Sequence, residues 1–126
     1  MASVSIKEFD KALIALAEAL EFAKKSDTQT FKIARDACIQ RFEFCIELAW
    51  KVSAKTLGST STTDKPVIRE MAQNDLISRT ELWFDFIEAR NKSSHSYDED
   101  IAVEVFKTVQ VFLQEGQNLY KKLKTK

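Results

Sequence analysis

The residues most capable of chemistry lie in one short segment, AlaArgAsnLysSerSerHisSerTyrAspGluAsp, at positions 89–100. It contains the only histidine of the chain, His95, which follows Arg90 by five residues. An arginine holds a phosphate through a planar fork of N–H donors, and a histidine takes and gives protons near neutral pH. Cleavage of RNA through the ribose 2′-hydroxyl requires both tasks. The pair is therefore compatible with metal-independent RNA cleavage.

Arg90 and His95 also have a structural interpretation. Arg90 would pair with Asp98 or Asp100, and His95 would hydrogen-bond the end of the preceding helix. A lone arginine and a lone histidine have such roles far more often than catalytic ones. The residues alone favour the structural interpretation.

Other kinds of chemical site are not indicated. His95 has no second histidine or thiolate nearby, so no metal site is predicted. The sequence lacks a glycine-rich phosphate loop and a GxSxG motif, and no cofactor is predicted. Trp83 and Phe86 could stack a base, but their helical spacing favours a place in the core.

The charge balance and the cysteines restrict the class of protein. Nineteen Lys and Arg balance nineteen Asp and Glu, so any nucleic acid must be engaged locally rather than through a basic excess. Cys38 and Cys45 are about 10 Å apart along a helix axis, too far for a disulfide. Two free thiols, with no secretory or membrane-spanning stretch, predict a cytoplasmic protein that has no contact with membranes.

The elements that must position the segment are expected to be helices. Only two Gly and one Pro occur among 126 residues, and this length suits a single domain over 1–126. Apolar residues recur at steps of three and four. The predicted helices cover about 5–25, 31–57, 66–74, 78–90 and 98–123. They predict an all-α, antiparallel four-helix up-and-down bundle with an additional short helix.

Two capping signals and one broad apolar surface refine this prediction. Ser5 with Glu8, and Ser78 with Glu81, have the spacing of a capping box at a helix start. The helix over 31–57 has more apolar surface than one neighbour covers, which predicts a central place or a dimer interface.

The segment Arg90–Tyr97 reads R-N-x-x-x-H-x-Y. With the length of the chain and its helix order, this motif resembles the HEPN superfamily, in the subfamily of nucleotidyltransferase substrate-binding proteins. The resemblance covers nearly the full length. It depends on Asn91 after Arg90, on Tyr97 two residues after His95, and on the acidic start of the last helix. It implies a two-fold homodimer that forms a complex with a minimal nucleotidyltransferase encoded nearby.

The resemblance implies two alternative functions. Active members are ribonuclease toxins, which makes Arg90 and His95 catalytic and Asn91 and Ser94 supporting polar residues. The nucleotidyltransferase is then the antitoxin, which adds AMP to the tyrosine that matches Tyr97. The older name of the subfamily implies instead a non-catalytic subunit, similar to the helical domain of kanamycin nucleotidyltransferase, that binds substrate or nucleotide for its partner. The sequence leaves both open.

Two further expectations concern the surface. We expect the helix over 78–90 and the motif of each protomer to approach the dimer axis, because the apolar surfaces of the second and fourth helices exceed what one small bundle buries. Tyr120 lies on the apolar face of the last helix and is the less accessible alternative to Tyr97 for modification.

Overall fold

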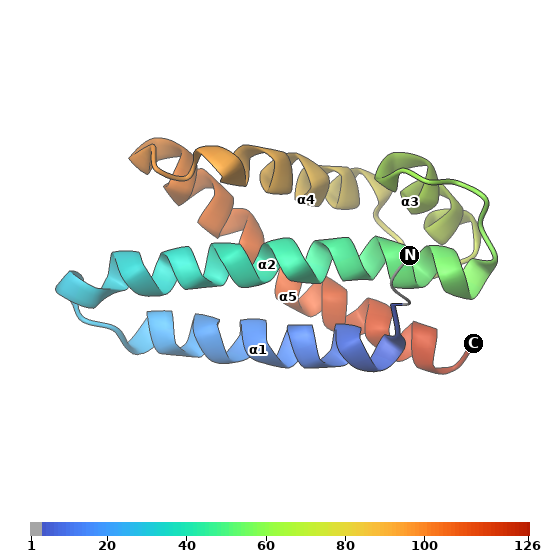
Figure 1. Cartoon of the computed structure of the whole chain (residues 1–126), viewed down its shortest axis with the longest axis horizontal. Helices are drawn as coiled ribbons and strands as arrows, with labels where there is room; N and C mark the ends of the chain where they lie inside the picture. The colour runs from blue at the N-terminus through green and yellow to red at the C-terminus, as the bar shows by residue number, and fades with distance from the viewer. Residues whose placement is uncertain (1–3) are drawn as a thin grey trace.

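The computed structural model describes residues 4–126, and every regular element within them is helical (Figure 1). Met1–Ser3, which contributed to the expectation that no secretory segment is present, lie outside this range. The elements are α1 (Ile6–Lys25), α2 (Thr28–Leu57), α3 (Asp64–Gln73), α4 (Thr80–Lys92), the 3₁₀ turn η1 (Ser93–His95) and α5 (Glu99–Lys124). Four long helices and one short helix confirm the predicted all-α bundle.

Polar side chains cap three of the long helices at their first turn. The Glu8 N–H donates to Ser5 Oγ at 3.1 Å, as the capping-box spacing predicts. Asp27 accepts from the Thr30 N–H at 2.9 Å and from the Thr30 hydroxyl at 2.8 Å, and these bonds hold the pKa of its carboxyl below its usual value. Asp98 accepts from the N–H groups of the first turn of α5. The predicted acidic start of the last helix is therefore a true cap.

The predicted cap at Ser78 is wrong. Helix α4 begins at Thr80, its N-cap is Arg79, and no side chain hydrogen-bonds its first turn. Leu76 and Ile77 are buried, which ties the chain to the core immediately before Ser78. Ser78 is exposed and lies too far ahead of the helix to reach its free N–H groups.

Aromatic rings form the centre of the core. Phe112 of α5 meets Phe42 of α2 edge to face at 5.2 Å and Phe86 of α4 at 5.1 Å between ring centroids. Trp83 is fully buried beside them, 5.8 Å from Phe112. Trp83 and Phe86 are thus core residues, as their spacing predicts. Gly116 keeps the α1–α5 contact close, because a Cβ there would lie 2.9 Å from Leu13 Cδ2.

Helix α2 is the central element, as its wide apolar surface predicts. It packs against α1, α3, α4 and α5, and Gly58 ends it in the left-handed conformation with φ 65°. Cys38 and Cys45 of α2 are buried, free thiols. Burial raises the pKa of Cys38 to about 11 and that of Cys45 to about 12.

The start of α2 is joined to the start of α5 by an ion pair. Arg35 is 5% exposed, and its two terminal nitrogens donate to the two carboxylate oxygens of Glu99 at 2.8 and 3.1 Å. This bidentate geometry fixes the end of the bundle where the α4–α5 connection lies (Figure 1). None of the helices within residues 4–126 has a stretch apolar enough to cross a membrane.

Candidate functional site

The predicted motif occupies a compact corner between α4 and α5, here called the junction (residues 90–98). The backbone stays hydrogen-bonded through it: the Ser96 N–H donates to the Ser93 carbonyl at 3.1 Å, and the Asp98 N–H donates to the His95 carbonyl at 3.0 Å. No long loop separates the two helices. The side chains of the motif are therefore held by regular structure.

Arg90 lies at the C-terminal end of α4 and reaches back to α2. Its Nε is 2.6 Å from Glu47 Oε1, with 38% of the arginine side chain and 26% of the glutamate side chain exposed. The Nε–H is not aligned with that oxygen, so the contact is an ion pair without a hydrogen bond. The expected alternative partners were wrong: within residues 4–126, Arg90 forms no ion pair with Asp98 or Asp100. Asp98 instead caps α5.

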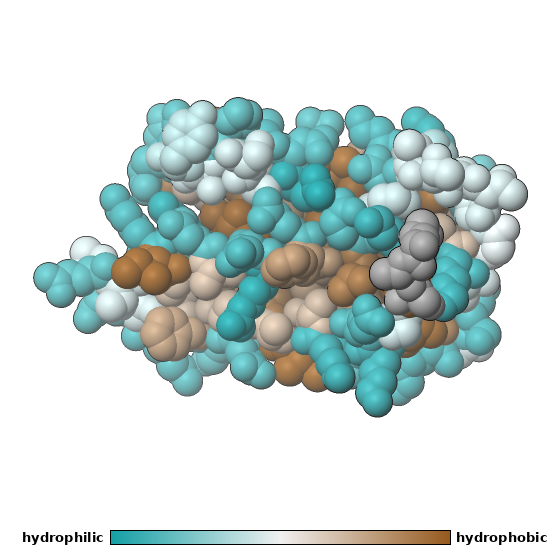
Figure 2. Space-filling model, in the orientation of Figure 1, coloured by the Kyte–Doolittle hydropathy of each residue, from teal (hydrophilic) through white to brown (hydrophobic). Residues whose placement is uncertain are grey.

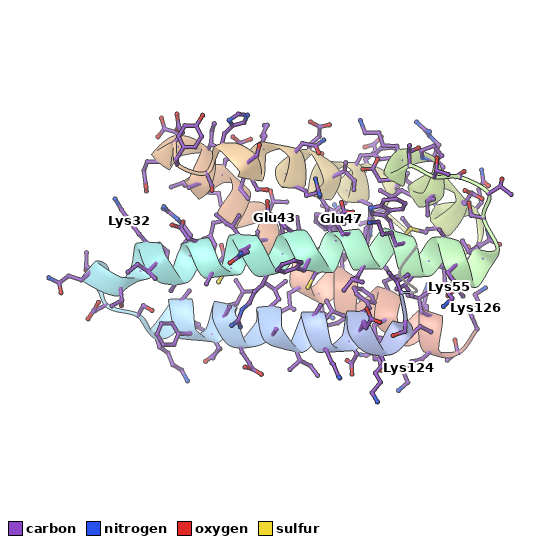
Figure 3. All side chains as sticks on the ribbon, in the orientation of Figure 1. Lys32, Glu43, Glu47, Lys55, Lys124 and Lys126 are labelled. Carbon is purple, nitrogen blue, oxygen red and sulfur yellow. The ribbon has the colours of Figure 1, made fainter. Side chains whose placement is uncertain are left out.

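A second carboxylate of α2 holds the turn that follows Arg90. Ser93 is buried, and its hydroxyl donates to Glu43 while lying 2.6 Å from the Arg90 carbonyl oxygen. Glu43 and Glu47 are one helical turn apart, and both project from α2 toward α4 (Figure 3). Sequence reasoning missed Glu43, Glu47 and Ser93. The available signal was a pair of carboxylates four residues apart in the central helix, on either side of the buried residues Cys45 and Ile46.

His95 and Tyr97 contact one another on the outside of the junction. His95 Nδ1 lies 3.1 Å from the Tyr97 hydroxyl, and the two rings meet edge to face at 5.8 Å. Tyr97 is 84% exposed. Within residues 4–126, the His95 side chain forms no hydrogen bond with the end of α4, where one was expected. Because Nδ1 faces the tyrosine, Nε2 is the ring nitrogen left for a ligand.

The remaining motif residues are exposed around this pair. The Ser94 hydroxyl donates to the Asn91 carbonyl at 3.2 Å, and both residues lie at the surface. Across the described residues, no hydrogen bond or ion pair joins Arg90 to His95, although both side chains belong to the same motif. Residues 4–126 also contain no group of three side chains suited to hold a metal ion.

The comparison with known families decides the classification. Residues 4–125 match the family described as nucleotidyltransferase substrate binding protein like. The chain belongs to this family. The match confirms the family resemblance carried by the motif and the helix order.

A curated relative also resembles the chain in sequence. A probable ribonuclease HepT of Haemophilus influenzae is 32% identical over an alignment of 94 positions that covers 68% of this chain and 64% of that protein. The chain therefore matches slightly less than two thirds of the length of this curated relative.

Two solved structures share the fold of the chain. The substrate binding domain of a nucleotidyltransferase from Haemophilus influenzae superposes with a TM-score of 0.82 at 23% identity, over 95% of this chain and 99% of that one. A protein of Thermus thermophilus gives a TM-score of 0.76 at 28% identity, over 89% and 98%. These likenesses place the helical bundle in a known fold.

Proposed function

We propose that this chain is a metal-independent ribonuclease, the toxin of a toxin–antitoxin pair whose other member is a nucleotidyltransferase. The observation that carries the proposal is the accessible His95, whose ring is oriented by Tyr97, on the same junction as the half-buried Arg90. Similarity to a probable ribonuclease supports it.

Arg90 would hold the phosphate to be cleaved. Glu47 lies at its Nε, and the two terminal nitrogens make no hydrogen bond or ion pair within residues 4–126. Those nitrogens form the edge of the guanidinium that binds a phosphate in two parallel bonds. The ion pair with Glu47 orients the guanidinium without consuming that edge.

His95 would act as the base. When Nδ1–H donates to the Tyr97 hydroxyl, the Nε2 lone pair is free to take the proton of a ribose 2′-hydroxyl. The 2′-oxygen then bonds to phosphorus, the bond from phosphorus to O5′ breaks, and O5′ receives a proton. The products are a 2′,3′-cyclic phosphate and a 5′-hydroxyl.

The step requires an acid as well as a base, which makes a homodimer part of the proposal. The attacking and leaving oxygens lie on opposite sides of phosphorus, so one imidazole cannot serve both. A two-fold axis near the junction would bring a second copy of His95 to the leaving oxygen.

Tyr97 would be the regulatory residue. Its hydroxyl oxygen would attack the α-phosphorus of ATP in the active site of the partner, with loss of the hydroxyl proton and release of pyrophosphate. The product lacks the hydroxyl hydrogen and carries a phosphate that competes with RNA for Arg90. Tyr97 is 84% exposed, so its side chain can enter the active site of another enzyme. Tyr120 instead packs against Phe9, at 6.4 Å between ring centroids.

A non-catalytic subunit that binds substrate or nucleotide for the nucleotidyltransferase is the second candidate. The description of the family favours it, as does the solved relative named as a substrate binding domain. The same junction would then bind a phosphate without cleaving it.

Cleavage of RNA by the purified chain separates the two candidates. We expect Arg90→Ala and His95→Ala each to lower the cleavage rate by about 100-fold or more, since each removes a group that acts in the transition state. Lys92→Ala is the matched control, because Lys92 lies at the same junction and its ammonium group forms an exposed ion pair with Glu104 at 2.9 Å. Wild-type protein that binds RNA or nucleotide but cleaves none would support the binding subunit.

Intact-mass analysis tests the modification. After co-expression with the nucleotidyltransferase encoded nearby, the wild type and Tyr120→Phe should gain one or more AMP units and lose ribonuclease activity. Tyr97→Phe should gain none. Modification that persists in Tyr97→Phe would refute this mechanism of regulation.

A further inference from the structure

The face formed by α1 and α2 exposes large apolar side chains that the bundle core does not use. Ile14 and Phe22 of α1 expose 51% and 65% of their surfaces, and Ile33 and Phe44 of α2 expose 73% and 62%. Figure 2 shows apolar residues along the middle of this face. The four side chains expose on the order of 500 Å² together, near the upper end of what a monomeric protein carries in one patch.

Two hollows lie between these projecting side chains. One, of 400 Å³, is lined by Phe22 and Ile33, and the other, of 340 Å³, is lined by Phe44 and Leu48. Their floors are formed by alanines: Ala12, Ala15, Ala19, Ala34 and Ala37. The face thus alternates large projecting side chains with depressions floored by methyl groups. Such a surface is complementary to a copy of itself rotated by 180°, because each projection then meets a depression.

The charges on this face also favour its own copy. Glu18 and Arg41 both line the hollows, and Arg41 donates to the Ala15 carbonyl at 2.6 Å. Neither side chain forms an ion pair in the part of the chain that the structure describes. A two-fold contact repeats every interaction, so a pair between Glu18 of one copy and Arg41 of the other would occur twice in the interface. A partner of one dominant charge would leave one of the two unpaired.

We propose that the α1–α2 face binds the same face of a second copy of this chain in a two-fold contact. Phe44 of each copy enters a hollow of the other. A stable interface buries about 800 Å² per partner. The four apolar side chains provide on the order of 500 Å² of such an area, and the aliphatic stems of Lys11 and Arg41 beside them add to it.

This contact is separate from the pairing proposed near the junction. Helices α1 and α4 lie on opposite sides of α2 (Figure 1), so the contact leaves Arg90, His95 and Tyr97 accessible. It also does not depend on RNA cleavage. If both contacts form and their two-fold axes are perpendicular, two dimers assemble into a tetramer.

Sedimentation of the full chain tests the proposal. At micromolar concentration, the molar mass of the wild type should be twice that of Phe44→Glu, because a buried carboxylate disrupts the apolar contact. Val111→Glu is the matched control: Val111 is 49% exposed, lies on α5 and does not line the hollows, so this variant should keep the wild-type mass. Circular dichroism should show equal helix content in all three proteins.

A charge exchange tests the two-fold geometry. Glu18→Arg and Arg41→Glu should each weaken self-association by about tenfold, and the double variant should restore most of it, since the pair re-forms with reversed signs. Equal masses for wild type and Phe44→Glu would overturn the proposal. If Phe44→Glu keeps its mass but no longer binds the nucleotidyltransferase, the face serves that partner and the proposal is also wrong.

Discussion

Two arginine–glutamate pairs join α2 to α5 and to α4, and they differ in how many N–H donors of the arginine stay available. Arg35 is 5% exposed and commits both terminal nitrogens to Glu99. Arg90 is 38% exposed and meets Glu47 only through Nε. In the first pair the protein uses the whole hydrogen-bonding edge of the guanidinium, whereas in the second it leaves that edge to solvent.

The difference separates a structural arginine from one suited to binding a ligand. A guanidinium already bound in two parallel bonds to a carboxylate cannot bind a phosphate without breaking them. One held at Nε alone keeps its direction and its binding edge. Arg90 therefore qualifies for a functional role because of its geometry as well as its place in the motif.

The largest expected effect is the difference in unfolding free energy between Arg35→Ala and Arg90→Ala. We expect Arg35→Ala to lose about 2 kcal/mol of unfolding free energy, because it removes two charge-assisted hydrogen bonds and a buried aliphatic stem. Arg90→Ala should lose less than about 0.5 kcal/mol, since its pair is partly exposed. Urea unfolding followed by circular dichroism measures both. Similar losses would mean that Arg90 is as structural as Arg35.

A smaller effect is expected from the carboxylate beside Arg90. Glu47→Gln keeps an oxygen near Nε but removes a negative charge that competes with phosphate. We expect KM for RNA to fall about two- to fivefold with kcat nearly unchanged. Glu47→Ala also loses the orientation of the guanidinium and should lower kcat. Glu81→Gln, on the exposed side of α4, is the control. A rise of KM in Glu47→Gln would contradict the proposed competition.

The smallest effect is the pH dependence of the Arg35–Glu99 pair. The hydrogen bond from Arg35 holds the pKa of Glu99 below its usual value of 4.5. A carboxyl with a lowered pKa contributes stability that is present above the usual value and is lost as the pH falls through the folded value. The stability difference between wild type and Glu99→Gln should therefore be full at neutral pH and shrink below about pH 4.5.

Urea unfolding at a series of pH values checks this prediction. Asp27 also has a lowered pKa, but it contributes equally to both proteins and cancels in the difference. A difference that stays constant down to acid pH would show that Glu99 titrates as it does in the unfolded chain.

The fold was predictable because its signals are local. The spacing of apolar residues and the caps at Ser5 and Asp98 act over one helical turn, and both helix starts are confirmed within a residue. The predicted start of α4 at Ser78 is wrong because tertiary packing buries Leu76 and Ile77 immediately before it. A capping signal carries no information about that packing.

The site was predictable only where it is continuous in the sequence. Residues from Arg90 to Tyr97 form one motif, so the contact between His95 and Tyr97 lies within it. Glu43 lies 50 residues from Ser93, and Arg35 lies 64 residues from Glu99. Contacts over such separations depend on how the helices cross, which neither periodicity nor residue type specifies.

The burial of Cys38 and Cys45 makes the protein suitable for selective labelling. With pKa values of about 11 and about 12, less than about one thiol in a thousand is ionised at neutral pH, and thiol reagents attack the thiolate. A cysteine introduced by Val111→Cys, which lies outside both the junction and the α1–α2 face, would therefore react with a maleimide dye or spin label while both native thiols stay unmodified. Distances between two labelled copies could then be recorded on a chain that differs from the natural one at a single residue.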